Sequence, residues 1–375
     1  MKFRRLFAVI LALGIVAGII YFAKTNTDSR RGTISLWCTA EMSAASELEE
    51  AVEDYNGSFQ RDSLPVELVE FSDEEALADA FEKQEPDLLF CSHFRALELW
   101  DEGRLSDIGK ELGPESPGYP KSVTSRSDAV GHGFFPVGSD IQLLVCGEDI
   151  DLGEAAADFR ALCTAASEYS IENGRKPFFA ADSFARLFCT QFLRQGEEFA
   201  PPVTRGGAHD AMEELYNAIA LAAYDGALAD CAGDCGEYVV SGALPCAVLS
   251  SAKLADLEGR LQIFPLPPMH SQDSRDNAGE MRGFAVTAGG CRNENEIAKF
   301  VSWILDSNRG SKLALKAGLV PAQECSLITR DRLWTVLLEI SRDSIVSLPL
   351  PDSACILGQE EFESSFREDM SRLAG

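Results

Sequence analysis

Short apolar runs alternate with amphipathic stretches through the first hundred residues of this chain. Three apolar runs predict buried strands, at 33–38, 65–71 and 87–91. The amphipathic stretches predict helices, at 43–58, 73–83 and 93–100, so that a helix follows each strand. This order is typical of a mostly parallel sheet covered on both faces, in which ligands bind beyond the carboxyl ends of the strands.

A second set of elements follows in the middle of the chain. It begins with two neighbouring predicted strands, at 131–137 and 140–147. Further strands are predicted at 178–182, 244–250 and 261–267, and helices at 154–173, 183–194 and 209–224. After a loop at 265–280, a strand is predicted at 282–289 and helices within 293–317, an alternation like that of the first hundred residues. The segment 327–375 is predicted to be helical with a loop at 349–352. Because a chain of 375 residues usually forms more than one core, we expect an α/β protein with two lobes.

The amino terminus predicts a membrane anchor. Residues 6–23 carry no charge, and eighteen residues of helix span roughly 27 Å, enough for a hydrocarbon core. Basic residues at 2, 4 and 5 should keep the terminus in the cytoplasm, so that the rest is exported to the cell-surface side of the membrane. A cleaved signal peptide, cut after Gly18, is the alternative. Lipoprotein processing is excluded because no cysteine lies near position 20.

Charge and cysteine usage narrow the function classes. With 60 acidic and 33 basic residues the formal charge is -27, which repels nucleic-acid phosphates, so no nucleic-acid partner is expected. Most of the eleven cysteines lie in apolar runs, as Cys38 and Cys246 do, and are predicted to be core residues. Cys231 and Cys235 could pair in a local disulfide or stay reduced. No second cysteine pair or suitably spaced histidine accompanies them, so we expect no metal and no cofactor.

An ordered series of short motifs carries a family resemblance. The motifs are ISLW with the helix that ends at 54–56, Pro86-Asp87-Leu88-Leu89, Gly103-Arg104-Leu105-Ser106-Asp107, Gly133-Phe134-Phe135-Pro136, the run to Asp149, Ser241-Gly242 before AVLSS, FPLPP, Gly283-Phe284-Ala285-Val286 and Gly318-Leu319-Val320-Pro321-Ala322. In this order they resemble the family 1 extracellular solute-binding proteins, the maltodextrin-binding-like receptors of ABC importers. The resemblance covers 33–375.

The resemblance implies a two-lobed periplasmic-binding-protein fold of type II, preceded by one N-terminal transmembrane or signal helix and a linker within 1–32. Lobe one would hold 33–136 plus 283–322, and lobe two 140–275 plus 325–375. Hinges would lie at 136–140 and 281–283, where Gly138 and Gly283 are placed to absorb dihedral changes. The family binds a small solute, often a sugar, between its lobes and presents it to the membrane subunits of an ABC permease.

Three departures from the family leave the solute and the mode of attachment open. The lipoprotein cysteine is absent, and the pair Cys146-Gly147 stands where an asparagine is often found after the second hinge strand. The strand that usually holds small residues and methionine here contains Leu244-Pro245-Cys246-Ala247.

Candidate ligand-binding residues lie at the carboxyl ends of the predicted strands and beside the return strand. The polar candidates are Thr39, Glu41, Ser92, His93, Asp182, Ser183, Ser250, Ser251 and Arg282, and the apolar ones are Trp37, Phe135, Phe184 and Met281. The competing interpretations are helix caps for the hydroxyl residues and core packing for the aromatic residues. Arg282 is the clearest single signal, because a basic residue beside a hinge in so acidic a chain suits an anionic ligand or a carboxylate of the other lobe.

Binding is favoured over catalysis. The chain has no GxSxG, HExxH, P-loop or GxGxxG motif after a strand. The segment 250–253 has the SxxK spacing of acyl-serine enzymes but lacks their companion motifs. We therefore expect an extracytoplasmic protein that captures a small solute and delivers it to an ABC-type permease. The alternative is a membrane-anchored sensory ectodomain that binds a small molecule and signals through a partner protein.

Overall fold

The computed structural model describes residues 32–40, 45–58, 63–108, 133–194, 210–231, 234–257, 259–323, 326–340, 345–347 and 353–374. The predicted anchor at 6–23 and the candidate Glu41 lie outside these ranges. Among the helices within them, none combines the length and the hydropathy needed to cross a membrane.

The first sheet is built from the amino-terminal strands and a strand that returns from late in the chain. Its strand order is β2 (Val66–Phe71), β1 (Ile34–Thr39), β3 (Leu88–Ser92), β8 (Asn277–Val286) and β4 (Phe134–Gly147). The first three strands are parallel, and β8 runs antiparallel to both β3 and β4. Strand β1 is buried along almost its whole length, as expected for a continuous apolar run in a sheet covered on both faces. The predicted parallel arrangement of these three strands is thus confirmed.

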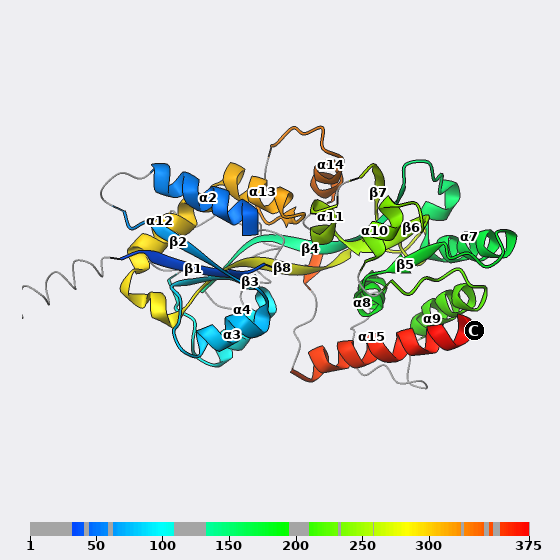
Figure 1. Cartoon of the computed structure of the whole chain (residues 1–375), viewed down its shortest axis with the longest axis horizontal. Coiled ribbons are helices and arrows are strands. Elements are labelled where there is room, and N and C mark those ends of the chain that lie inside the picture. Colours follow the sequence, from blue (N-terminus) through cyan, green and yellow to red (C-terminus); the bar gives the residue numbers. More distant parts are fainter. Residues whose placement is uncertain are drawn as a thin grey trace, which may run out of the picture.

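Helices cover both faces of this sheet (Figure 1). One face packs against α2 (Ala45–Ser58), α12 (Glu294–Ile304) and α13 (Ser307–Lys316), and the other against α3 (Glu74–Phe81) and α4 (His93–Asp101). Local sequence fixes where helices start, because Asp73 and Ser92 accept hydrogen bonds from the backbone N–H groups of Ala76 and Arg95. Each face therefore has its own apolar core.

Strand β4 joins the two halves of the molecule and corrects one prediction. The pattern predicted two strands, at 131–137 and 140–147, but the structure has one strand of 14 residues with a register shift between Pro136 and Gly138. Gly138, which was expected to lie in a hinge between the two strands, is a residue of this continuous strand and packs closely against Leu319 and Val320. A Cβ atom there would lie 2.7 Å from the carbonyl oxygen of Val320. The first half of β4 pairs with β8, and the second half belongs to the other sheet.

The second sheet contains β4, β6 (Cys246–Ser250), β5 (Phe179–Ala181) and β7 (Leu261–Pro265). Around it lie the helices α7 (Phe159–Glu172), α8 (Phe184–Arg194), α9 (Asp210–Tyr224), α10 (Cys235–Val240), α11 (Ser251–Ala255) and α15 (Ser353–Ala374). In Figure 1 the two groups of elements lie side by side as two lobes, and β4 and β8 run between them. The lobe boundaries given above stay a prediction.

The remaining elements depart in part from the predicted pattern. Strand β8 begins at Asn277 rather than at 282, and helix α7 begins at Phe159, where Asp158 accepts a hydrogen bond from the N–H of Ala161. Two 3-10 turns span Gly153–Ala156 and Ala288–Arg292. Within 327–375, helix α14 (Arg332–Glu339) is followed by a short strand, β10 (Ile345–Ser347), which pairs with β8. Strand β9 (Val320–Pro321) pairs with β4.

Candidate functional site

A cavity of about 250 Å³ lies where the two sheets share β4. The carboxyl ends of β5 and β6 open onto it, and β8 passes along it. Its lining residues are Asp140, Asp182, Ser183, Arg186, Ser250, Ala252, Lys253, Asp256, Glu280 and Arg282. Binding beyond the carboxyl ends of strands is the arrangement that the strand order predicts.

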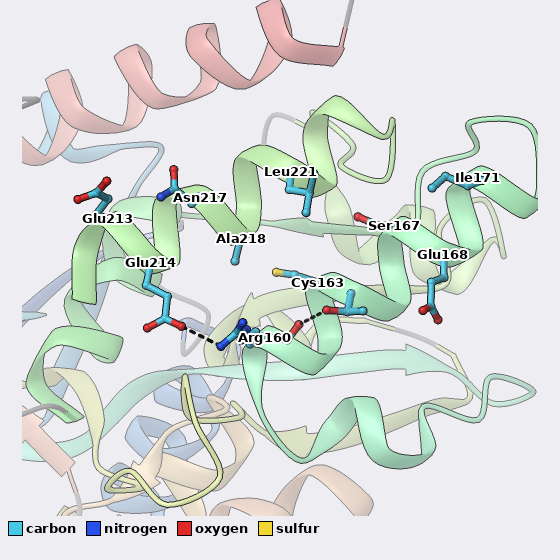
Figure 2. Close-up of a pocket in the computed structure, with 11 residues that line it drawn as sticks. Arg160, Cys163, Ser167, Glu168, Ile171, Glu213, Glu214, Asn217, Ala218 and Leu221 are labelled. Carbon is cyan, nitrogen blue, oxygen red and sulfur yellow. Dashed lines mark hydrogen bonds and ion pairs between the residues drawn. The ribbon is translucent and has the colours of Figure 1, made fainter. Parts of the chain in front are cut away.

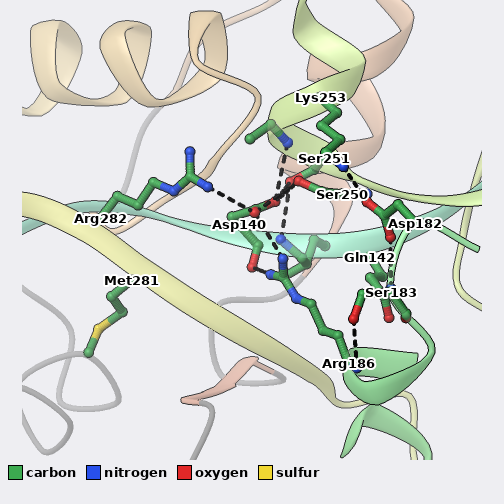
Figure 3. Close-up of polar contacts among 12 residues, drawn as sticks. Asp140, Gln142, Asp182, Ser183, Arg186, Ser250, Ser251, Lys253, Met281 and Arg282 are labelled. Atoms are coloured by element: carbon green, nitrogen blue, oxygen red, sulfur yellow. Dashed lines mark hydrogen bonds and ion pairs between the residues drawn. The ribbon is translucent and has the colours of Figure 1, made fainter. Parts of the chain in front are cut away.

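Asp140 is the centre of the polar network in this cavity (Figure 3). Its side chain is 1% exposed, and it forms ion pairs with Arg186 at 2.9 Å and Arg282 at 3.4 Å. Ser250 Oγ donates to both carboxylate oxygens, at 2.8 and 2.9 Å, and Ser251 Oγ donates to Oδ1 at 3.1 Å. Burial alone would raise the pKa of Asp140, but the two guanidinium charges and the hydrogen bonds outweigh it and hold the pKa well below its usual range. Asp140 is thus a buried, ionised carboxylate.

Asp182 fixes the end of β5 against β6. Its Oδ1 accepts a hydrogen bond from Gln142 Nε2 at 3.1 Å, and its Oδ2 accepts one from the backbone N–H of Ser250 at 2.7 Å. The ammonium group of Lys253 lies 3.8 Å from the same carboxylate, on a side chain that is 53% exposed. Next to Asp182, Ser183 Oγ accepts from the N–H of Arg186 at 3.2 Å and caps α8. These side chains are therefore held in place before any solute arrives.

The structure brings part of the predicted candidate set together. Asp182, Ser183, Ser250 and Arg282 line the cavity, and Ser251 contacts Asp140 from the start of α11. These five come from three separate stretches of sequence, so only the tertiary fold unites them.

The other candidates lie elsewhere. Four of them are packed in apolar cores: Trp37, Phe135, Phe184 and Met281. The hydroxyl of Ser92 caps α4, and the buried His93 stacks on Phe94 with Nδ1 3.4 Å from the carbonyl oxygen of Met281. Thr39 is buried at the end of β1, and its hydroxyl has no hydrogen-bond partner among the residues described. None of these seven is among the residues that line the cavity.

Five of the seven charged residues that line the cavity were not predicted from the sequence. Asp140, Arg186, Lys253, Asp256 and Glu280 were not among the candidates. Two of them carried a signal, since Asp140 is a single charge within the apolar run 134–146 and Arg186 lies on a helix whose neighbouring positions are mostly apolar. A charge in such a position is rarely buried unless it is paired.

A larger hollow, of about 560 Å³, lies on the second lobe between α7 and α9 (Figure 2). Arg160 and Glu214 form an ion pair across it at 3.2 Å, and Ile171 and Leu221 on its lining are mostly exposed. Its lining residues come from these two helices alone, and no strand end reaches it. The smaller cavity, where elements of both sheets converge on buried polar groups, is therefore the better candidate site.

Comparison with known proteins identifies the fold. No protein-family model and no curated protein sequence matches the chain. A solved structure of the cyclic alpha-maltosyl-1,6-maltose binding protein from Arthrobacter globiformis is 14% identical, with a TM-score of 0.70 over 92% of this chain and 96% of that one. UgpB from Mycobacterium tuberculosis, in complex with glycerophosphocholine, is 16% identical, with a TM-score of 0.69 over 91% and 96%. Maltose-bound MalE3 of T. maritima is 13% identical, with a TM-score of 0.67 over 91% and 97%.

At these identities the likeness concerns the fold. The chain has the two-lobed type II periplasmic-binding-protein fold, so the fold class implied by the sequence resemblance is confirmed.

Proposed function

We propose that this protein is an extracytoplasmic solute-binding protein. It captures a small solute, a sugar or a related polar molecule, between its two lobes and delivers it to an ABC-type permease. The observation that supports this proposal most directly is the polar cavity at the junction of the two sheets, lined from β4, β8 and the ends of β5 and β6.

The cavity suits binding because its polar groups are already oriented. The Asp140 and Asp182 networks hold the surrounding side chains in fixed positions, so that little ordering entropy is lost when a solute enters. The fold is shared with proteins whose solved structures hold maltose or glycerophosphocholine.

Delivery requires that the loaded protein differ from the empty one. A solute can close two lobes only when it binds the closed form better than the open form. Glu280 and Arg282 of β8 line the cavity together with the end of β6, so a solute there contacts the strand that runs between the lobes as well as lobe two. The proposal also includes export of the protein, with residues 6–23 retaining it at the membrane. Its partners are the membrane subunits of a permease.

A thermal-shift screen of the full chain tests the binding function. The panel contains sugars, polyols, amines and small acids, and a true solute at 100 times its Kd should add about 2.7 kcal/mol to the free energy of unfolding. Lys253→Ala, which removes a half-exposed side chain from the cavity wall, should weaken the response, whereas Arg260→Ala should not. Arg260 is highly exposed, contacts Glu148 and lies outside the cavity. An unchanged unfolding temperature across every class of compound would contradict the proposal.

A further inference from the structure

The wall of the cavity is unusually charged for a site that binds an uncharged molecule. Seven of its ten lining residues carry a charge, four acidic and three basic, and none of the ten is aromatic. Small-molecule sites in general are lined mainly by hydrophobic and aromatic side chains, with few polar groups. A neutral sugar would have to cover these charges without neutralising any of them, at a cost in desolvation.

The pairing within the wall shows which charges remain for a solute. The carboxylate of Asp140 is already occupied by ion pairs with Arg186 and Arg282 and by hydrogen bonds from the neighbouring serine hydroxyl groups. Glu280 and Asp256 form no hydrogen bond and no ion pair with any residue that the structure describes. Both carboxylates can therefore accept hydrogen bonds from a solute, although Glu280 is attracted at longer range by the charge of Arg186.

The wall also keeps guanidinium N–H donors that can bind an anionic group. Two guanidinium groups share the single carboxylate of Asp140, so neither has that carboxylate to itself. Arg282 gives Asp140 only Nη2, at 3.4 Å, and its buried Nε has no hydrogen-bond partner among the residues described. An arginine has five N–H donors in a planar fork that fits a carboxylate. Arg282 can thus bind a planar anionic group beside Asp140.

These two kinds of free group lie close together. Glu280 and Arg282 are two residues apart on β8, so their side chains emerge from the same face about 6.6 Å apart along the strand. Glu280 is paired with Asp140 in the β4–β8 register, which places both on the cavity side of the strands. A solute that joins them must carry opposite charges only a few bonds apart.

The cavity also limits the size of the solute. Its 250 Å³ is small beside the roughly 300 to 1,000 Å³ that is usual for small-molecule sites. This suits a molecule of amino-acid size better than an oligosaccharide.

We propose, resting on the solute-binding function above, that the solute is a small zwitterion of amino-acid size. Its carboxylate lies against Arg282, and its ammonium group lies against Glu280, with Asp256 adding to the negative potential. A simple anion would be repelled by Glu280 and Asp256, and a simple cation would offer no acceptor to the unpaired Nε–H of Arg282.

The test is calorimetry on the full chain with matched compounds. A pool of L-amino acids and glycine betaine is screened first, beside maltose as the neutral comparison. The compound that binds is then compared with its analogue lacking the amino group and its analogue lacking the carboxylate. Each analogue should bind at least tenfold more weakly, because a charge-assisted hydrogen bond is lost.

Glu280→Gln separates a contact with the solute from a structural role. It should raise the Kd of the zwitterion roughly tenfold while leaving the Kd of the analogue without the amino group unchanged or lower. Because Glu280 forms no hydrogen bond or ion pair with the residues described and attracts Arg186 only at longer range, the variant should fold with at most a small loss of stability. Glu148→Gln, outside the cavity, is the charge-matched control and should change neither Kd.

Three results would contradict the proposal that the solute is a zwitterion. They are tight binding of maltose instead, equal binding of the analogue without the amino group, and an unchanged Kd in Glu280→Gln. In each of these cases a solute still binds, so the proposed function stands. If neither the zwitterions nor the broader panel binds, the proposed function fails together with this inference.

Discussion

Asp140 neutralises a pair of guanidinium groups that have little other access to water. The side chains of Arg186 and Arg282 are 13% and 16% exposed, and both reach the same carboxylate. Removing one partner of a buried ion pair usually costs more than the pair contributes, because the remaining charge is left without compensation. Asp140 therefore has a structural role in the cavity wall, whatever solute binds there.

Asp140→Asn should lower the free energy of unfolding by about 3 to 5 kcal/mol near neutral pH, measured by urea denaturation. The folded-state pKa of Asp140 lies below its usual range, so its contribution is complete above the unfolded-state pKa of about 3.9 and is lost as the pH falls further. The gap between variant and parent should therefore narrow below about pH 4. Asp256→Asn, at an exposed position without an ion pair among the residues described, is the control. A loss no larger in Asp140→Asn than in the control would refute this account.

The cysteines behave as core residues. All nine that the structure describes are free, and eight of them are buried. Burial raises the pKa of Cys38 to about 12, with Glu70 adding to the effect, and it raises the pKa of Cys146 to about 11. Thiols with such pKa values are poor nucleophiles because almost none is ionised at neutral pH.

Alkylation of the native protein should consequently label Cys291, the exposed one of these nine, far faster than the other eight. In the unfolded, unreduced protein at least seven of the eleven thiols should react. Mass spectrometry counts the labels in both states. Fewer than three labels after unfolding would reveal disulfides instead.

At the scale of elements, the contact between β4 and β8 depends on the absence of a side chain. Gly138 and Gly283 were expected to provide hinge flexibility, but neither has a backbone φ in the left-handed region. A Cβ on Gly283 would collide with the carbonyl oxygen of Phe135 and lie 2.7 Å from the Cα of Pro136. Close approach of neighbouring segments, β4 at Gly283 and residues 314–320 at Gly138, explains glycine at both positions better than dihedral freedom does.

Gly283→Ala should therefore lower the free energy of unfolding by about 1 to 3 kcal/mol, as expected for overpacking against backbone that cannot easily move. Gly57→Ala is the matched control, because no atom lies within 4 Å of its added Cβ and it lies within α2. That variant should be neutral or up to about 1 kcal/mol more stable. Thermal and urea denaturation of both variants make the comparison. If the two variants were equally stable, β4 would be able to move aside for the added methyl group, which would contradict this explanation.

At the scale of the whole molecule, few strands connect the two lobes. Strand β4 pairs with β8 in one sheet and with β6 and β7 in the other, so it passes through both. The cavity lies beside this connection, and a movement of β8 against lobe two would change the distance across it. A solute bound there can therefore favour a closed arrangement.

Small-angle scattering should show a smaller radius of gyration when the solute is saturating than when it is absent. Lys253→Ala at the same solute concentration should show a smaller shift, because its weaker binding leaves more of the protein open. A radius of gyration that stays constant at saturation in the parent protein would exclude closure.

The sequence alone determined the elements and their general arrangement. Apolar runs placed β1 and β3, because a strand covered on both faces must be apolar along its length. Asp73 signalled the start of a helix through local chemistry within three residues. The ordered motifs then implied the fold class, and the likeness to solved structures bears it out.

Only the tertiary structure decided how the cavity is assembled. Asp140 meets Ser250 at a sequence separation of 110 and Arg282 at a separation of 142, contacts that depend on strand register and on which sheet each half of β4 joins. Residues such as Ser92 and Ser250 look alike in sequence, each ending a strand, yet one caps a helix and the other holds Asp140. A local pattern fixes which face a side chain occupies, but its partner across the sheet is set by long-range pairing, which no window of sequence contains.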